Sequence, residues 1–353
     1  MSEKVLMKGN EAIAEAAIRA GCRHYFGYPI TPQTELAAYM AKRMPKIGGV
    51  FLQAESEIAA INMVYGVSST GKRVMTSSSS PGVSLKQEGI SYIAGSDLPA
   101  LIVNVERGGP GLGGIQPSQS DYYQATKGGG HGDYHLIVLT PASVQEMADL
   151  TALAFDLSDQ YRVPAMLLAD GTIGQMMEPV VLPEESASKV EKPWALTGTQ
   201  MARPHNIVNS LYLVPEELER TNLERFERYA EIEAKEARYE SFMMDDAEVC
   251  VVAFGIAARV SKNAVVAARA EGIKAGLIRP ITVWPFPKQA IADAAPRVKG
   301  FVSVELSMGQ MIDDVRLACG CAKPAALCSR VGGMIPSPDE VLAAIKNMNG
   351  GNA

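Results

Sequence analysis

The stretch from residue 51 to residue 82 constrains the fold of this chain most strongly, because it pairs two short apolar runs with two polar corners. The first run leads into Glu55 and Glu57 and then into a helical pattern of small residues. The second run, 73–76, leads into the sequence SSSSPG. In open parallel sheets, ligands collect outside the carboxyl ends of the strands. The pattern therefore predicts a ligand site built from an acid at a helix start and a hydroxyl-rich loop.

The same alternation of strand and helix patterns continues along the chain and predicts a doubly wound α/β sheet. Continuous apolar runs, typical of parallel strands buried on both faces, recur at 100–105, 136–139 and 165–169. A proline-containing stretch and a charged helix, predicted for 215–242, precede a second set of strands and helices. We therefore expect a first domain over 1–171, a linker over 172–244 and a second α/β domain over 245–353.

The composition excludes several classes of function. The chain has 353 residues and a net charge of −6, which gives no electrostatic reason for nucleic acid binding. An apolar run of about eighteen residues, the minimum for a membrane span, does not occur. The polar N-terminus also lacks the apolar core of a signal peptide. We therefore expect a cytoplasmic protein.

The cysteines do not predict a disulfide framework, because their number, five, is odd and no secretion signal is predicted. Cys319, Cys321 and Cys328 form a C-x-C-x6-C pattern that could hold an iron–sulfur cluster or zinc. Such sites normally need four ligands at other spacings, so we favour buried thiols near a helix end. No metal site is predicted in this chain, and metal centres for redox chemistry would lie on another chain.

Three polar residues at predicted strand ends are candidate site residues. Glu57 either complements the bare N–H groups of its helix or faces a ligand, and the pattern leaves both open. Thr31 is predicted to be the N-cap of the helix that follows it, a place that also directs a hydroxyl towards a ligand. Arg107 is either part of a structural ion pair or a clamp for a carboxylate, which its planar fork fits. His131 and His135 are expected to be ordinary loop residues.

A set of segments in this order resembles the alpha-type subunits of 2-oxoacid:ferredoxin oxidoreductases: GNEAIAEAAIRAGC, GYPITPQTE, QAESEIAAINMVYG, TSSSSPGVSL, VNVERGGPG, IRPITVWPFP and VELSMGQM. The likeness runs from Gly9 to about Gly333 and is strongest to the separate-chain form of the branched-chain (2-oxoisovalerate) enzymes. It implies a thiamine diphosphate enzyme. The first domain would be the pyrimidine-binding domain of the transketolase fold, and the second would resemble the transketolase C-terminal domain.

The resemblance also implies roles for individual residues. The family glutamate that hydrogen-bonds N1′ of the cofactor's aminopyrimidine ring, and so promotes removal of the C2 proton, corresponds to Glu57. The family threonine corresponds to Thr31 and is expected near the carboxylate or carbonyl of the substrate. Pro29 and Ile30, just before it, are expected to contact the cofactor. The arginine that clamps the substrate carboxylate corresponds to Arg107.

One motif of thiamine diphosphate enzymes is missing. These enzymes bind Mg²⁺ and the diphosphate through a GDG motif, and Asp170-Gly171 lacks its first glycine. We therefore expect a half-site, with the GDG motif, Mg²⁺ and diphosphate on a beta subunit. The [4Fe-4S] clusters would lie on partners that include a ferredoxin-like cluster subunit, and a gamma subunit is also expected. Partners would supply the contacts to coenzyme A, ferredoxin would accept electrons, and the assembly would be a dimer of heteromers.

Three functions are consistent with these features. The leading one is a subunit that oxidatively decarboxylates 2-oxoisovalerate to an acyl-CoA and CO2. The second changes only the substrate, to 2-oxoglutarate, and would be favoured by a second cation in the pocket. The third is a non-catalytic scaffold subunit, against which the presence of Glu57 and Thr31 argues.

Overall fold

The apolar runs of the first half of the chain form the inner strands of a seven-stranded sheet. The computed structural model describes residues 4–186, 188 and 190–350, and the strand order is β12-β6-β7-β5-β4-β2-β3. The parallel strands are β2 (His24–Gly27), β3 (Val50–Gln53), β4 (Val74–Ser78), β5 (Leu101–Glu106), β6 (Ile137–Leu139) and β7 (Ala165–Asp170). Every residue of β4, β5 and β7 is buried, as expected for strands covered on both faces.

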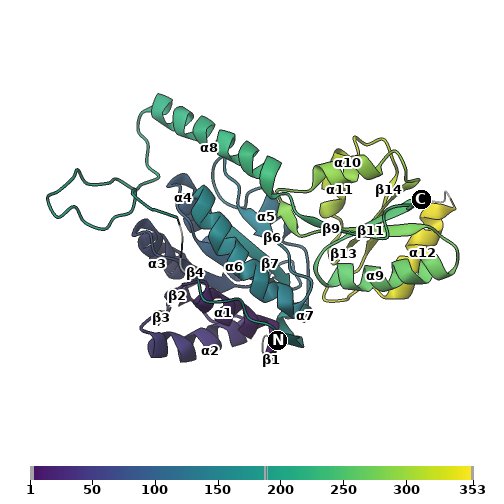
Figure 1. Ribbon diagram of the computed structural model, residues 1–353, viewed down its shortest axis with the longest axis horizontal. Coiled ribbons are helices and arrows are strands. Elements are labelled where there is room, and N and C mark those ends of the chain that lie inside the picture. The colour runs from purple at the N-terminus through teal and green to yellow at the C-terminus, as the bar shows by residue number, and fades with distance from the viewer. Residues whose placement is uncertain (1–3, 187, 189, 351–353) are drawn as a thin grey trace.

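Two groups of helices cover this sheet (Figure 1). Right-handed crossovers place α3 (Glu57–Ser69) and α4 (Ser80–Gly95) on one face. They place α1 (Gly9–Arg19), α2 (Thr34–Arg43) and α6 (Val144–Tyr161) on the other, where α1 packs on both neighbours. Since α3 follows β3 and α4 follows β4, both helices start at the carboxyl edge of the sheet. This is the edge at which the sequence predicts a ligand site.

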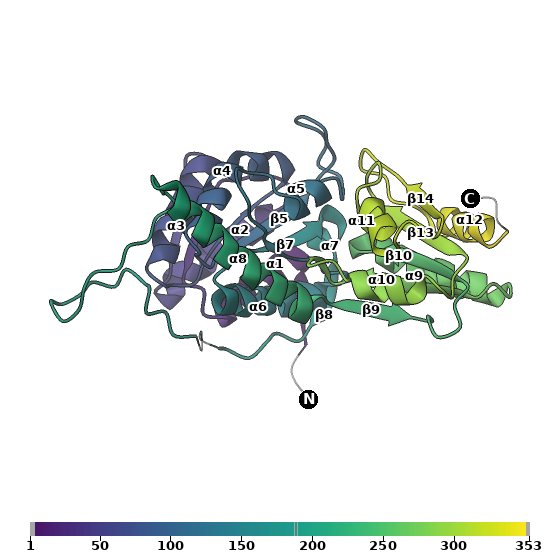
Figure 2. The same cartoon turned by 90° about the horizontal axis from the view of Figure 1, so that it is seen from above.

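The second half of the chain forms a five-stranded sheet of its own, shown beside the first in Figure 2. Its order is β14-β13-β10-β11-β9, and β9 is antiparallel to β11. The strands are β9 (Tyr239–Phe242), β10 (Val249–Ala253), β11 (Ala275–Pro280), β13 (Gly300–Glu305) and β14 (Ala325–Ser329). The helices are α9 (Gly255–Ala270), α10 (Lys288–Ala294), α11 (Met311–Ala318) and α12 (Pro338–Asn349).

Two strands pair with a sheet from which a predicted domain boundary separates them in the sequence. The strand β12 (Thr282–Trp284) lies within 245–353 but pairs antiparallel with β6 of the first sheet. Conversely, β9 lies within the predicted linker and pairs with β11. The remaining short elements are β1 (Val5–Lys8), β8 (Met177–Val180), η1 (Met44–Ile47), α5 (Tyr122–Thr126) and α7 (Gly171–Gln175). Division into domains 1–171 and 245–353 therefore remains a prediction.

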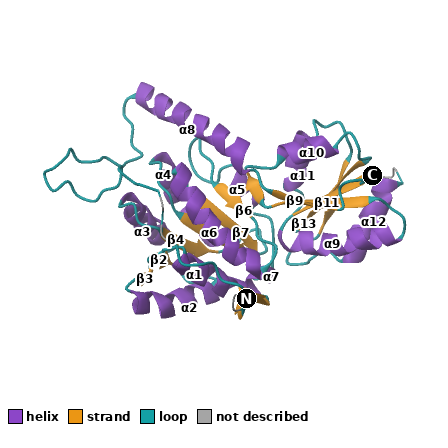
Figure 3. Ribbon diagram, in the orientation of Figure 1, coloured by secondary structure: helices purple, strands orange, loops and turns teal. Residues whose placement is uncertain are grey.

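The charged helix is shorter than its sequence pattern predicts. The helix α8 (Pro215–Glu236) ends before 239–242, which forms β9 instead, because pairing with β11 outweighs the local helical pattern. The segment that leads into α8 extends away from the body in Figure 1. Figure 3 shows this segment as loop. Among the helices of the described residues, none has the length and apolar character that crossing a bilayer requires.

The two bodies are joined by buried polar contacts. The carboxylate of Asp170 accepts hydrogen bonds from the main-chain N–H groups of Thr172 and Ile173, at 3.0 and 3.1 Å, and so caps α7. Its other oxygen accepts from the N–H of Ile256 in α9, at 2.9 Å. Arg279 donates two hydrogen bonds to Glu146 of α6, at 2.7 and 2.9 Å. Asp170 therefore acts as a structural link between the two sheets.

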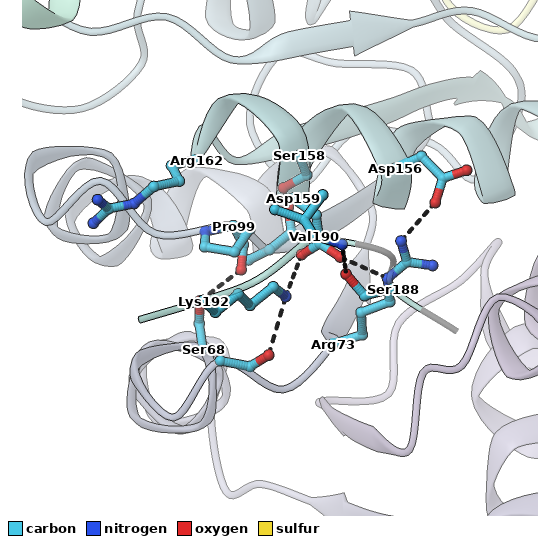
Figure 4. Close-up of polar contacts among 12 residues, drawn as sticks. Ser68, Arg73, Pro99, Asp156, Ser158, Asp159, Arg162, Ser188, Val190 and Lys192 are labelled. Carbon is cyan, nitrogen blue, oxygen red and sulfur yellow. Dashed lines mark hydrogen bonds and ion pairs between the residues drawn. The ribbon is translucent and has the colours of Figure 1, made fainter. Parts of the chain in front are cut away.

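A buried ion network ties the predicted linker to the first sheet (Figure 4). Asp159 of α6 has only 2% of its side chain exposed and accepts from Arg73 Nε at 2.8 Å. Its other oxygen pairs with Lys192. The second partner of Arg73, Asp156, is 63% exposed. The charge of Asp159 therefore compensates two largely buried cations.

We predict that Asp159→Asn destabilises the chain by about 3–5 kcal/mol, because it leaves Arg73 and Lys192 without their shared buried anion. The matched control is Asp156→Asn, which removes a solvent-exposed partner of the same arginine and should cost about 0–1 kcal/mol. Urea unfolding of both variants checks the difference. Equal losses would show that burial does not set the strength of this network.

Candidate functional site

Glu57 is free to face a ligand, because another residue caps its helix. The hydroxyl of Ser56 accepts a hydrogen bond from the N–H of Ala59, at 3.1 Å, and is the N-cap of α3. Glu57 is 7% exposed. A Cβ placed on Gly82 would lie 2.7 Å from Glu57 Oε1, so the carboxylate lies against the first turn of α4. Ser56 is therefore the N-cap of α3, Glu57 is an acid of its first turn, and a ligand contact at Glu57 stays a prediction.

The serine loop places the buried hydroxyl of Ser78 beside that carboxylate. Ser78 ends β4, Ser79 precedes α4, and Ser80 is the first residue of the helix. The Ser80 N–H donates to Asn104 Oδ1 at 3.0 Å. The hydroxyls of Ser78 and Ser79 are buried and have no hydrogen-bond partner among the described residues. The loop and the helix N-terminus thus present donors where an anion or a polar ring could bind.

Arg107 follows β5 and holds the loops around the site together. Its guanidinium donates to the main-chain carbonyls of Thr31, at 3.1 Å, and Leu112, at 2.9 Å. Its N–H donates to the Ser80 hydroxyl at 3.0 Å. No carboxylate of the described residues forms an ion pair with it, and its Nε has no partner there. The interpretation as a structural ion pair is therefore wrong, and the charge of Arg107 can compensate an anion.

The loop after β2 holds the remaining predicted residues. Pro29 and Thr31 are exposed and Ile30 is half-buried. The prediction that Thr31 is an N-cap is wrong, because α2 begins at Thr34 and its N-cap position is Gln33. Thr31 reaches Arg107 through its main-chain carbonyl. The structure thus joins Thr31, Arg107 and the start of α4 directly, and places Glu57 against the first turn of that helix.

Two cavities open on this edge. One, of about 550 Å³, lies between the two bodies and is lined by Ser80, Arg107, Asp121, Ser307, Met308 and Gln310, among others. The other, of about 600 Å³, is lined by residues that include Thr31, Gln116 and Thr172. Thr31 and Arg107, which are hydrogen-bonded to each other, line one cavity each. The site therefore has room for a small substrate and for part of a larger cosubstrate.

A cluster of buried acids forms the floor of the site. Glu106 Oε1 accepts from the Asp121 N–H at 2.9 Å, and Asn104 donates to Asp121 at 2.8 Å. Burial, with the neighbouring charge of Asp121, raises the pKa of Glu106 well above its usual value. Burial also raises the pKa values of Asp121 and Asp170. Sequence reasoning missed Asn104 and Asp121. The signal for Asn104 was a polar residue inside the apolar run of β5, and the loop position of Asp121 gave none.

Neither the cysteines nor the GDG-like Asp170-Gly171 forms a metal site among the described residues. Cys319 follows α11, Cys328 lies on β14 and Cys321 is exposed between them. Both oxygens of Asp170 are already used by main-chain N–H groups. Within the described ranges, no three side chains among His, Cys, Asp and Glu are arranged to hold a metal ion.

Comparison with known families identifies the class of protein. The sequence model described as pyruvate flavodoxin/ferredoxin oxidoreductase, thiamine diphosphate-binding, matches residues 15–243. The model described as pyruvate:ferredoxin oxidoreductase core domain II matches residues 247–341. The chain belongs to this oxidoreductase family, with a thiamine diphosphate-binding domain followed by a second α/β domain, which confirms the predicted fold class.

Within the family, the chain is a subunit of a 2-oxoacid:ferredoxin oxidoreductase. It is 51% identical over 346 residues to the ketoisovalerate oxidoreductase subunit VorB of Methanothermobacter thermautotrophicus, which covers 98% of both chains. It is 50% identical to the VorB subunit of Methanothermobacter marburgensis, with the same coverage. The 2-oxoglutarate synthase subunit KorA of M. thermautotrophicus is 38% identical and covers 99% of this chain and 100% of its own. The predicted family is confirmed, and these subunit names indicate a multi-subunit complex.

Solved structures share the fold. A 2-oxoglutarate:ferredoxin oxidoreductase from Magnetococcus marinus, with 2-oxoglutarate, coenzyme A and succinyl-CoA bound, superposes with a TM-score of 0.87 at 27% identity. The match covers 98% of this chain and 65% of that one. A split-gene transketolase, as an inactive beta4 tetramer, gives a TM-score of 0.61 at 14% identity over 99% and 98% of the chains. This second likeness concerns the fold alone.

The residues around Glu57 fit the pyrimidine half of thiamine diphosphate. The ring needs an acid at N1′ and neighbouring hydrogen-bond partners. Glu57 offers a carboxylate with no hydrogen bond from a described residue, and Ser78 and Ser79 offer unused hydroxyls. Gly82 leaves the space in which the carboxylate lies. We therefore infer a cofactor contact at Glu57.

We predict that Gly82→Ala lowers the affinity of the purified complex for thiamine diphosphate about tenfold or more, because the new methyl group would overlap the Ser78 hydroxyl and the Glu57 carboxylate and displace them. Gly66→Ala is the matched control: no atom lies within 4 Å of its added Cβ, and the exchange should stabilise α3 by about 1 kcal/mol. Calorimetric titration and urea unfolding measure the two effects. Unchanged affinity in Gly82→Ala would contradict the position assigned to Glu57.

Proposed function

We propose that this chain is the subunit of a 2-oxoisovalerate:ferredoxin oxidoreductase that holds the pyrimidine ring of thiamine diphosphate and the carboxylate of the substrate. The complex would convert the 2-oxoacid and coenzyme A to an acyl-CoA and CO2, with two electrons passed to ferredoxin. The observation that supports this substrate most strongly is the identity of about 50% to two ketoisovalerate oxidoreductase subunits over nearly the whole chain.

The chain's own residues would bind and orient the reacting groups. Thiamine diphosphate, when bound, supplies the electron sink that decarboxylation of a 2-oxoacid needs. Glu57 would hold or share the proton at N1′ of the pyrimidine ring. Arg107 would bind the substrate carboxylate, and its contact with the Thr31 carbonyl fixes the guanidinium at the mouth of the site. The cavity that Arg107 lines lies between the two bodies, whose walls would shield the reacting groups from water.

The charges around the cavities favour a monocarboxylate. Among the described residues that line the two cavities, Arg107 is the one cation. A dicarboxylate such as 2-oxoglutarate would need a second compensating charge, because an unpaired buried carboxylate is costly. The KorA relatives and the solved 2-oxoglutarate enzyme keep 2-oxoglutarate as the alternative substrate. A scaffold role is not supported by the arrangement of Glu57 and Arg107.

Partner subunits would complete the site. Large apolar side chains are exposed after β2 (Tyr28), on the edge strand β3 (Val50 and Leu52) and in the first two turns of α3 and α4 (Ile58 and Leu85). Such a patch is typical of a protein interface. We infer that a beta subunit with the GDG motif, Mg²⁺ and the diphosphate contacts covers it. A gamma subunit and a ferredoxin-like subunit with [4Fe-4S] clusters would complete a dimer of heteromers and help bind coenzyme A.

A panel of 2-oxoacids tests the substrate. The complex, purified with its co-purifying partners, should reduce a viologen dye in the presence of coenzyme A and 2-oxoisovalerate. We expect kcat/KM for 2-oxoisovalerate to exceed that for 2-oxoglutarate about tenfold or more. The reverse order would overturn the substrate assignment, and activity of this chain alone would contradict the need for partners.

We predict that Glu57→Gln lowers turnover about 10²–10⁴-fold, because the amide cannot hold the N1′ proton. Glu55→Gln, two residues away and exposed, is the matched control and should retain turnover. The dye assay on both purified complexes distinguishes the catalytic role from a scaffold role, in which Glu57→Gln would leave turnover unchanged.

We predict that Arg107→Lys raises KM for the 2-oxoacid about tenfold or more with a smaller change in kcat, because lysine keeps the charge but loses the planar fork. Steady-state kinetics measure the split. The value of KM for coenzyme A serves as the internal control. Unchanged KM for the 2-oxoacid would show that the substrate carboxylate binds elsewhere.

A further inference from the structure

One loop of the second body borders the cavity that Arg107 lines from the first body. The segment 306–310 joins β13 to α11 and is hydrogen-bonded to the first body (Figure 2). All its residues except the glycine line this cavity of about 550 Å³, namely Leu306, Ser307, Met308 and Gln310. A molecule bound at Arg107 would therefore face this loop across the cavity.

The two walls of the cavity differ in charge. The first body contributes the charged residues Arg107 and Asp121 to the lining. The lining residues of the second body, all of them in the part of the chain that the structure describes, are uncharged. They include the apolar side chains of Leu306, Met308 and Val331. A 2-oxoacid whose carboxylate pairs with Arg107 would thus meet an apolar surface with the rest of its carbon chain.

Met308 is the apolar side chain that extends furthest from this wall. It is 80% exposed, whereas Leu306 is buried, so Met308 does not pack on its own body. A single exposed methionine is ordinary on a protein surface, and its position at the cavity is what indicates a ligand contact. Its unbranched, polarisable chain suits contact with an irregular aliphatic group.

A buried carboxylate holds the loop in one shape. Glu305 ends β13 and is 1% exposed. It accepts hydrogen bonds from the hydroxyls of Ser303 and Ser307, at 2.7 and 2.8 Å, and from the main-chain N–H groups of residues 310–312, at 2.8, 3.0 and 2.9 Å. These N–H groups have no partner within α11, so the carboxylate caps that helix. Gly309, with φ of +95°, allows the turn before it.

Two glutamines fix the loop relative to the first body. The side-chain amide of Gln119 accepts from the Leu306 N–H at 3.1 Å and donates to the Phe254 carbonyl at 2.9 Å. From the second body, the amide of Gln310 accepts from one main-chain N–H and donates to one carbonyl of the segment 120–123, both at 2.8 Å. Directional hydrogen bonds therefore set the width of the cavity, which selection by substrate size requires.

We propose that Met308 is a specificity-determining residue that contacts the aliphatic side chain of the 2-oxoacid, and that Gln119 and Gln310 are positioning residues that set its distance from Arg107. The inference rests on the proposed function and extends it to the side-chain end of the substrate. A second carboxylate at that end would meet Met308 without a compensating charge, so the same residue disfavours 2-oxoglutarate.

A substitution at the exposed Met308 tests the contact without disturbing a core. In the purified complex, Met308→Lys should raise kcat/KM for 2-oxoglutarate relative to 2-oxoisovalerate about tenfold or more, because lysine would pair with the second carboxylate. Pyruvate has only a methyl group at this end, and its kcat/KM should change about threefold or less. Met243→Lys, at an exposed methionine outside the cavity, is the matched control and should leave the ratio unchanged.

Gln310→Met tests the positioning role, because it removes both hydrogen bonds of the amide and keeps the length of the side chain. We expect KM for 2-oxoisovalerate to rise about tenfold with a smaller change in kcat, and discrimination against the longer 2-oxoisocaproate to decrease. Gln289→Met is the matched control, since this exposed side chain bonds to Asp293 within α10. An equal loss of kcat for every 2-oxoacid would overturn the positioning role.

A second readout needs no turnover. Met308→Cys introduces a thiol at the cavity, and mass spectrometry follows its alkylation by iodoacetamide in the purified complex. Added without coenzyme A, 2-oxoisovalerate should slow this alkylation about threefold or more, because the bound side chain would cover the thiol. Cys321, which is exposed and does not line the cavity, is the internal control.

The outcomes separate this inference from the proposed function. If Met308→Lys keeps the natural substrate ratio, or changes KM for coenzyme A instead, Met308 does not face the substrate side chain and the inference is overturned while the proposed function stands. Alkylation that 2-oxoisovalerate does not slow overturns it equally. A natural complex that oxidises no 2-oxoacid in the presence of coenzyme A overturns the proposed function itself.

Discussion

The close approach of α3 and α4 is the interaction on which the site depends. Glycines at 82 and 89 let the two helices approach closely, since a Cβ at 82 would overlap Ser78 and Glu57 and a Cβ at 89 would overlap Ile61. This contact brings the acid that follows β3 to the serine loop that follows β4. The helix start that carries Glu57 and the serine loop, which are separate in the sequence, thereby form one surface. Larger residues at these positions would separate the helices and move Glu57 away from Ser78.

The distribution of charge at the carboxyl edge follows from differences in burial. Glu106 and Arg107 are neighbours in sequence, yet they do not neutralise each other. Burial raises the pKa of Glu106 well above its usual value, and Arg107 donates to carbonyl groups instead of a carboxylate. The guanidinium thus keeps its full charge for an anion. The buried acids Glu106, Asp121 and Asp170 and the guanidinium of Arg107 give the site the polarity that a 2-oxoacid requires.

Much of the fold was predictable, because continuous apolar runs of this length are typical of parallel strands that are buried on both faces. Glu57 and Arg107 were predictable as strand-end residues and, with Thr31, through resemblance. Local patterns failed where tertiary contacts decided: 239–242 joins a sheet although it continues a helical pattern, and Thr31 does not cap α2. The role proposed for Met308 was missed because this residue lies far from Arg107 in the sequence, and only the packed structure brings both to one cavity.

The strand β12 has a consequence for synthesis on the ribosome. The seven-stranded sheet takes one of its two edge strands from residues 282–284, more than a hundred residues after β7 in the chain. A nascent chain that has been synthesised only as far as β7 exposes the edge of β6, because the strand β12 that pairs with this edge does not yet exist. The N-terminal half therefore acquires its complete sheet only after most of the C-terminal half has left the exit tunnel. The order in which the two halves mature is set by this returning strand.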